Sequence, residues 1–255
     1  MELLVFNYDG FHIIYPEAYF QFLKETFILD VYRTNLLSEN DVVLDLGACT
    51  GDFCILASKK VGKNGKVIAI EPDAENYKLL ELNIQRNNCH NVIPINVGVG
   101  SHEGQKEITA PCDKTFISKI NTLENILNGL NIKHEINFIK MDIEGVEADV
   151  VTKSIEIIKR ANVISLEFHG TKEKVDNILL NYGFSFKPIT MSYLYKKIIK
   201  NLFLHPLTTY KVCIDTITKN ASIMQKAITG FDMTKDYLLV GTYVKSRERL
   251  SNSHI

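Results

Sequence analysis

A short apolar run that ends beside an acid and two glycines constrains this chain more than any other stretch. Val42–Leu46 has the length of a buried strand, and Gly47 and Gly51 follow it before a helical pattern begins. A second apolar run, Val67–Ile70, comes about twenty residues later and ends in Glu71. A strand, a glycine turn, a helix and a second strand are typical of a βαβ unit whose turn holds a nucleoside-containing cofactor.

The charge of the turn distinguishes between such cofactors. A dinucleotide rests its pyrophosphate on the helix N-terminus, where the carboxylate of Asp45 would repel it. S-adenosylmethionine carries an ammonium and a sulfonium and has no phosphate, so the same carboxylate favours it. Gly47 and Gly51 would let the backbone approach the ligand, and Glu71 is placed to accept both ribose hydroxyls. An ordinary strand-turn-helix, with glycines that serve only the turn, is the alternative.

Length and composition suit one medium-sized domain with an elaboration. The chain has 255 residues and a formal net charge of −1, so no overall field draws it to nucleic acid or to a membrane surface. Its five scattered cysteines lack paired spacing and indicate reduced thiols in a cytoplasmic protein. Cys89, His90 and Cys112 make a poor metal motif. No leader pattern and no apolar run of about 18 residues is present, so neither a signal peptide nor a membrane span is expected.

The N-terminal residues predict a hairpin followed by helices. Two apolar runs, Leu3–Phe6 and Phe11–Ile14, flank Asp9–Gly10, a pair typical of a hairpin turn. Aromatic and aliphatic residues then recur at helical spacing over Ala18–Leu37, which predicts one or two helices with a packed aromatic stripe.

Strands and helices alternate along the rest of the chain. Apolar runs predict parallel strands at Val42–Leu46, Val67–Ile70, Val92–Val97, Asn137–Met141 and Val163–Phe168. Amphipathic patterns predict helices at Phe53–Val61, Asn76–Asn88, Glu147–Arg160 and Thr171–Asn181. Between Ser101 and Asn137 the pattern is less regular, with a polar strand near Lys106–Ile108 and a helix at Leu123–Leu130. This order predicts an α/β fold, a Rossmann-like seven-stranded, mostly parallel sheet with helices on both faces.

The last two strands are expected to be an antiparallel pair at the edge of the sheet, Phe184–Lys187 and Tyr237–Val244. The lysine-rich insert between them is predicted to be helical. It could be a cap for an anionic or sugar-like acceptor, a solvated elaboration or a dimer contact. The domain boundaries that follow are 1–40 for the hairpin and helices, 41–189 and 236–247 for the sheet domain, 190–235 for the insert, and 248–255 for a disordered tail.

Polar side chains follow most of the predicted strands. Ligands bind beyond the carboxyl ends of the strands in such sheets, so these side chains should converge. They are Asp45, Glu71, Asn96, Asp142, Glu144, Glu167 and His169. Asn96 is either a hydrogen-bonding partner of the adenine or a turn asparagine. His169 has an ordinary pKa suited to a base near neutrality, unless it is a strand-end histidine satisfied by structural hydrogen bonds.

The most specific motif in the chain is Phe138–Glu147, which contains Asp142, Ile143, Glu144, Gly145 and Glu147. It resembles the Asp-hydrophobic-Glu-Gly-x-Glu motif of the FkbM family of S-adenosylmethionine-dependent class I methyltransferases. Glu71–Pro72 and the strand end at Asn96 also fit, and the resemblance extends over about residues 42–183. The chain departs from the family pattern at Cys49, where the family usually carries asparagine, and in its long insert.

The resemblance implies an enzyme that uses S-adenosylmethionine to O-methylate a small molecule or a glycan. The candidate catalytic residues are Asp142, Glu144, Glu167 and His169. The candidate cofactor-binding residues are Asp45, Gly47, Ala48, Cys49, Gly51, Glu71, Pro72, Asn96, Val97 and Asp142. A hydroxyl acceptor needs a base to take its proton, with His169 as one candidate. No metal site is assigned, although Asp142 and Glu144 could hold Mg²⁺ as an alternative way to acidify the acceptor.

Two other functions remain open from the sequence. An RNA methyltransferase could use the lysine-rich insert to grip phosphates, although the near-neutral charge and the lack of an RNA-binding module disfavour it. A binding protein without activity could share the same scaffold, since a fold alone does not establish chemistry. The retained acids disfavour that reading. A homodimer is compatible with the sequence.

Overall fold

The main element of the fold is a seven-stranded sheet, seen in a computed structural model that describes residues 2–110, 114–132, 136–206 and 240–245. Its strand order is β11-β12-β10-β9-β3-β4-β5. The strands are β3 (Val42–Leu46), β4 (Lys66–Ile70), β5 (Val92–Ile95), β9 (Phe138–Met141), β10 (Val163–Glu167), β11 (Phe184–Pro188) and β12 (Val240–Lys245). Neighbours from β10 to β5 are parallel, whereas β12 is antiparallel to both β10 and β11. The predicted mostly parallel sheet with an antiparallel pair at its edge is confirmed.

Both faces of the sheet are covered, which explains why its strands read as continuous apolar runs. In β3, Val43 packs into one core and Leu44 into the other, and all of β3 after Val42 is buried. The helices around the sheet are α2 (Asp52–Val61), α3 (Ala74–Arg86), α4 (Leu123–Gly129), α5 (Glu147–Lys153), α6 (Ile155–Ile158) and α7 (Lys172–Asn181). The single helix predicted over Glu147–Arg160 is wrong, because the backbone leaves the helical conformation at Ser154 and divides it into α5 and α6.

The N-terminal hairpin consists of β1 (Leu3–Tyr8) and β2 (Phe11–Pro16), as predicted from its turn. Asn83 of α3 and Asn87, which caps the C-terminus of α3, accept hydrogen bonds from the backbone amides of β2 and donate to its carbonyls. Side-chain amides therefore pair with the outer edge of the hairpin. The segment that follows is helical but irregular. It comprises the short 3₁₀ helix η1 (Glu17–Tyr19), α1 (Phe20–Leu23), the π-helical η2 (Lys24–Leu29) and the 3₁₀ helix η3 (Thr34–Leu36).

A second, three-stranded sheet lies beyond the carboxyl end of β5, and the sequence did not predict it. Its strands are β6 (Gly98–Val99), β7 (Gly104–Ala110) and β8 (Lys114–Asn121), in the order β6-β8-β7. The β7 strand was expected, but β8 was missed. Its inward alternation of Phe116, Ser118 and Ile120 is masked by Ile117, which is 72% exposed on the outer side.

The predicted insert begins with α8 (Met191–Leu204), which packs on η2. Lys197 and Tyr193 both bind Asp30, and Asn201 donates to the carbonyl of Ile28. Residues 207–239 and 246–255 lie outside the described residues, so the rest of the insert, the start of the last predicted strand and the predicted disordered tail do as well. Among the described residues, no helix combines the length and apolarity needed to span a membrane.

Candidate functional site

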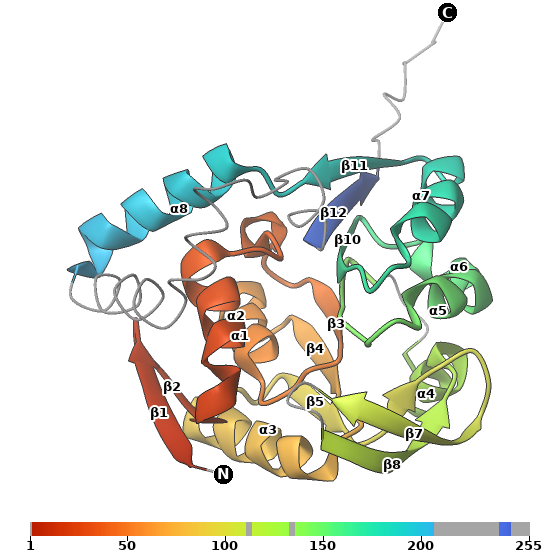
Figure 1. Cartoon of the computed structure of the whole chain (residues 1–255), viewed down its shortest axis with the longest axis horizontal. Helices are drawn as coiled ribbons and strands as arrows, with labels where there is room; N and C mark the ends of the chain where they lie inside the picture. Colours follow the sequence, from red (N-terminus) through yellow and green to blue (C-terminus); the bar gives the residue numbers. More distant parts are fainter. Residues whose placement is uncertain (1, 111–113, 133–135, 207–239, 246–255) are drawn as a thin grey trace, which may run out of the picture.

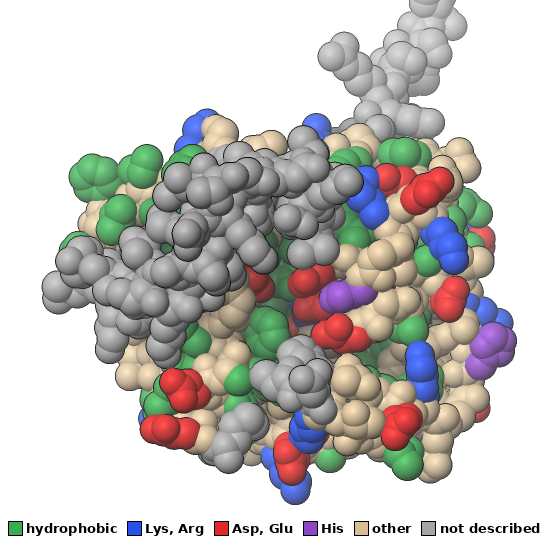
Figure 2. Space-filling view, in the orientation of Figure 1, with side chains coloured by type: hydrophobic (Ala, Val, Ile, Leu, Met, Phe, Trp, Pro, Cys, Tyr) green, Lys and Arg blue, Asp and Glu red, His purple; other side chains and the backbone are tan. Residues whose placement is uncertain are grey.

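A cavity of about 700 Å³ opens at the carboxyl ends of the central strands. It lies where the strand order reverses: β4 and β5 lie on one side of β3, and β9 and β10 on the other. This is the place where open α/β sheets bind their ligands. Figure 2 shows acidic side chains and a histidine around a hollow in the middle of this face. The irregular N-terminal helices form one wall, and the β7–β8 hairpin forms another.

The glycine turn after β3 is shaped by the neighbouring strand. Gly47 has a φ of +80°, and a Cβ built on it would lie 1.9 Å from the carbonyl oxygen of Asp142, which follows β9. Lys140 of β9 donates to the carbonyl of Gly47 at 2.6 Å. Gly47 does line the cavity. Glycine is nevertheless needed at this position so that the ends of β3 and β9 can lie close together, and not only so that a ligand can approach.

Glu71, at the end of β4, is held by two backbone amides while it lines the cavity. Its Oε2 accepts from Cys49 at 2.8 Å, and its Oε1 accepts from Asp73 at 2.8 Å. The side chain is buried, and this burial raises the pKa of Glu71 to about 7. Each oxygen retains a second lone pair for a ligand hydroxyl. Pro72 and Val97 also line the cavity.

Asp45 was predicted to bind the cofactor, but it does not reach the cavity. It is fully buried and is absent from the cavity lining. Burial raises its pKa to about 7, and Lys140 lies 3.5 Å from its Oδ1. Neither carboxylate oxygen accepts a hydrogen bond from any described residue. Asp45 therefore contacts the turn indirectly, because Lys140, which lies beside Asp45, donates to the carbonyl of Gly47.

Three other predicted cofactor residues lie off the cavity. Ala48 is buried, with its amide bound to the carbonyl of Ile70, and Gly51 caps α2 with a φ of +98°. The side-chain amide of Asn96 donates to the carbonyl of Glu71 at 2.8 Å, and Asn96 lines a separate, smaller pocket. Asn96 thus stabilises the backbone at Glu71. This favours the interpretation of Asn96 as a turn asparagine over its interpretation as a partner of the adenine.

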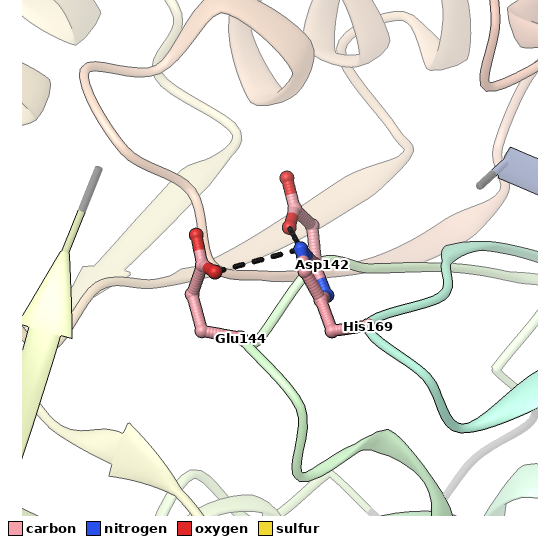
Figure 3. Close-up of side chains that lie close together, drawn as sticks. All are labelled: Asp142, Glu144 and His169. Carbon is pink, nitrogen blue, oxygen red and sulfur yellow. Dashed lines mark ion pairs between the residues drawn. The ribbon is translucent and has the colours of Figure 1, made fainter. Parts of the chain in front are cut away.

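The four predicted catalytic residues do converge. Asp142 and Glu144 follow β9, Glu167 ends β10, and His169 comes two residues later; all four line the cavity. The Nε2 of His169 lies 3.5 Å from Glu144, 3.9 Å from Glu167 and 4.0 Å from Asp142. Figure 3 shows the carboxylates of Asp142 and Glu144 turned toward this ring.

The other nitrogen of the His169 ring is fixed by Glu147. Its Nδ1 lies 2.9 Å from Oε1 of Glu147, a carboxylate that also accepts from the amide of Gly145 and the hydroxyl of Thr171. The hydrogen bond to Glu147 raises the pKa of His169 to about 9. This contact favours the protonated ring, which donates a proton, in contrast to the base suggested by its ordinary pKa. Burial raises the pKa of Glu167 above its usual range.

Several residues at the cavity were not singled out from the sequence. Lys140 lines the cavity and Glu147 lies behind His169; both belong to the Phe138–Glu147 motif, and a lysine in a buried strand was a usable signal. Asp52 begins α2, accepts a hydrogen bond from Thr26 and lines the cavity. The N-terminal segment also contributes Glu25 and Tyr32, of which Tyr32 donates to Asp142 at 3.2 Å. No local pattern marks these two residues, because tertiary packing alone brings them here.

Acidic residues dominate the cavity as a whole. Nine aspartates and glutamates, but only two lysines, are among the described residues that line it. Such a surface favours a ligand with positive charge and opposes a polyphosphate.

The chain was compared with curated proteins, solved structures and protein-family models. No curated protein matches the chain. Among solved structures, the methyltransferase FkbM of Methylobacillus flagellatus KT is 22% identical to this chain, with a TM-score of 0.49. The match covers 62% of this chain and 42% of that one, so the present chain spans less than half of that protein's length.

Two further structures are similarly distant. The precorrin-6y C5,15-methyltransferase of Geobacter metallireducens GS-15 is 18% identical, with a TM-score of 0.42 over 64% of this chain and 72% of that one. A SAM-dependent methyltransferase of Aquifex aeolicus is 14% identical, with a TM-score of 0.42 over 68% and 90%. The model of the methyltransferase FkbM domain matches residues 45–186, more than half of the chain, and the protein belongs to this methyltransferase family.

Proposed function

We propose that the protein binds S-adenosylmethionine and transfers its methyl group to the oxygen of a small-molecule or sugar hydroxyl. The observation that supports this most strongly is Glu71, a buried carboxylate held by two backbone amides at the wall of an acid-lined cavity. The residues fit the cofactor, because Glu71 has free lone pairs for ribose hydroxyls and the surplus carboxylates suit an ammonium and a sulfonium. The cytoplasmic location and the homodimer stay predictions.

When bound, S-adenosylmethionine supplies an electrophilic methyl group that an oxygen lone pair can attack in line. Glu71 would hold the ribose, with Gly47, Cys49, Pro72 and Val97 as the adjoining wall. Lys140 fixes the carbonyl of Gly47, so the turn is ordered before a ligand arrives.

The chain's own contribution to the reaction is removal of the acceptor proton. We assign this role to Glu167 in its ionised form, because its carboxylate lines the cavity 3.9 Å from Nε2 of His169, whose positive charge favours that form. Asp142 and Glu144 would orient the hydroxyl beside it. His169 faces all three carboxylates and, as a proton donor, can hydrogen-bond the acceptor. The hydroxyl proton would pass to Glu167 as the oxygen bonds to the methyl carbon; the bond from that carbon to the sulfonium sulfur breaks, and S-adenosylhomocysteine leaves as a neutral thioether.

Calorimetric titration with S-adenosylmethionine tests the proposal directly. We expect one site per chain, and Glu71→Ala should weaken it by at least tenfold because the ribose loses its acceptors. Glu81→Ala is the matched control, since it removes an exposed carboxylate from α3 away from the cavity. Absence of binding at millimolar cofactor, or equal affinities for both variants, would contradict the assignment.

A further inference from the structure

We propose that Asp142, Glu144 and His169 form a binding site for one divalent metal ion, of the Mn²⁺ type, on the wall of the cavity. One ligand atom from each of these residues can be chosen so that all three lie within 4.8 Å of one another. The three side chains come from the ends of two adjacent strands, and Figure 3 shows them facing a common point.

The distances suit a single ion. Metal-ligand bonds of about 2.1 Å place two ligands of one ion between about 3 and 4.2 Å apart. The Nε2 of His169 lies 3.5 Å from Oε2 of Glu144 and 4.0 Å from Oδ1 of Asp142. Small side-chain rotations would therefore complete the geometry. An ion at this point would take the place of the Nε2 proton.

A separate set of contacts already holds the imidazole as a metal-bound histidine is held. Histidine ligands commonly donate their second nitrogen to a carboxylate, which fixes the ring. Glu147 provides that carboxylate: it is fully buried, and it binds Nδ1 of His169, the amide of Gly145 and the hydroxyl of Thr171. Glu147 cannot reorient without breaking all three contacts. Nε2 is thus presented to the cavity in a fixed direction.

The carboxylates are also prepared for a cation. On Asp142, Oδ2 accepts from Tyr32 and lies 3.7 Å from Lys140, which leaves Oδ1 on the side of His169. In the described part of the chain, Glu144 and Glu167 form ion pairs only with His169. Four carboxylates, counting Glu147, therefore surround one imidazole in a partly buried place, and of these four only Asp142 also lies near a lysine among the described residues. Uncompensated negative charge in such a place is costly.

The donor set also selects the ion. Imidazole nitrogen is a good ligand for transition metals, whereas Mg²⁺ prefers oxygen ligands and keeps its waters. One nitrogen and two carboxylates should therefore bind Mn²⁺ more tightly than Mg²⁺. If the proposed O-methylation is correct, the remaining coordination positions face the cavity, and an acceptor oxygen bound there would lose its proton more easily. This second role rests on the proposed function, whereas metal binding does not.

Electron paramagnetic resonance of Mn²⁺ tests the site without cofactor or acceptor. After the protein is stripped with chelator, added Mn²⁺ should lose its free six-line signal with a stoichiometry of one per chain. Pulsed measurements of the bound ion should show coupling to a nitrogen that disappears in His169→Ala. A roughly tenfold higher concentration of Mg²⁺ than of Mn²⁺ should be needed to displace the ion.

Variants separate the ligands from their surroundings. Glu144→Gln should weaken Mn²⁺ binding at least tenfold, and Glu144 is 40% exposed, so this variant should fold. Glu147→Gln should weaken binding by 10 to 100-fold, although it removes no ligand. Glu173→Gln, on the exposed face of α7, is the control and should change nothing.

No Mn²⁺ binding by the intact protein, or bound Mn²⁺ without nitrogen coupling, would overturn the proposal. Because cofactor affinity is measured by a different titration, failure of the metal site and failure of the proposed function are distinguishable.

Discussion

At the scale of single residues, the buried carboxylate of Glu71 links ligand binding to stability. Burial raises its pKa from an ordinary value near 4.5 to about 7. The native state therefore holds this proton more tightly than the unfolded chain does. The resulting contribution to stability is fully present below about pH 4.5 and is lost as the pH rises through 7.

Glu71→Gln should remove that dependence on pH. The free energy of unfolding of the wild type minus that of the variant should fall between pH 5 and pH 8, by up to about 3 kcal/mol. Other titrating groups are common to both proteins, so they cancel in the difference. Urea unfolding of both proteins at several pH values measures this difference. If the free energies of unfolding of the two proteins change in parallel with pH, Glu71 titrates as an ordinary glutamate.

The backbone of Cys49 is strained, because it adopts a left-handed conformation that is unfavourable for cysteine. Its φ is 49°, in the left-handed region that asparagine tolerates better than most other residues. Asparagine is also the residue that the FkbM pattern usually carries here. The amide of Cys49 binds Glu71, so the conformation is needed for the site.

We expect Cys49→Asn to stabilise the protein by about 0.5 to 1 kcal/mol, because it relieves this strain. Thermal unfolding without ligand is the measurement. Cys49→Ala is the control, since it removes the thiol and keeps the strain. Equal melting temperatures for the two variants would mean that backbone strain is not the cause.

At the scale of elements, the junction of β3 and β9 positions the whole site. Gly47 and Asp142 follow these two adjacent strands, and the carbonyl of Asp142 occupies the space that a side chain on Gly47 would need. Lys140, which is part of β9, stabilises the same junction through its contacts with Gly47 and Asp45. A change at this contact should therefore separate the strand ends, and with them the two halves of the cavity.

Gly47→Ala should prevent stable folding, whereas Gly62→Ala should cost about 1–3 kcal/mol, because the backbone of Gly62 lies in a region that few residues other than glycine adopt. Both glycines have a positive φ, +80° and +70°, but a Cβ on Gly62 meets nothing within 4 Å. The pair thus separates backbone strain from collision with β9. Chemical denaturation of the two variants measures the difference, and similar losses of stability would exclude the collision.

The elements that the sequence predicted correctly are those with strong local patterns. The apolar runs of β3, β4 and β10 and the turn of the N-terminal hairpin need no knowledge of their neighbours. The β8 strand was missed because Ile117 points to solvent and hides the alternation. Within the site, acids at strand ends were predictable, because the edge of a parallel sheet collects them. Tyr32 and Glu25 were not, because only the packing of the N-terminal helices brings them to the cavity.

At the scale of the whole molecule, charge is distributed unevenly although the sum is close to zero. The formal net charge is −1, yet acids greatly outnumber lysines around the cavity. A phosphate backbone could therefore approach this opening only against repulsion. This distribution counts against the RNA methyltransferase that the lysine-rich insert had suggested.

Bulk tRNA should bind weakly and with little dependence on salt. Proteins that neutralise several phosphates lose affinity steeply as salt rises, with a slope of about −0.7 per contact on single strands. The slope is measured by fluorescence anisotropy with labelled tRNA at salt concentrations between about 50 and 200 mM. A steep loss of affinity would restore the RNA hypothesis and would locate the contacts outside the acidic cavity.

The position of β12 also has a consequence for synthesis of the protein. This strand, Val240–Lys245, is inserted between β10 and β11, although both are translated well before it (Figure 1). On the ribosome, the nascent chain must therefore hold the edge of β10 open while the whole insert is made. Unpaired strand edges of this kind promote aggregation and recruit chaperones. The sheet that carries Glu167 is completed only when β12 pairs with β10 and β11.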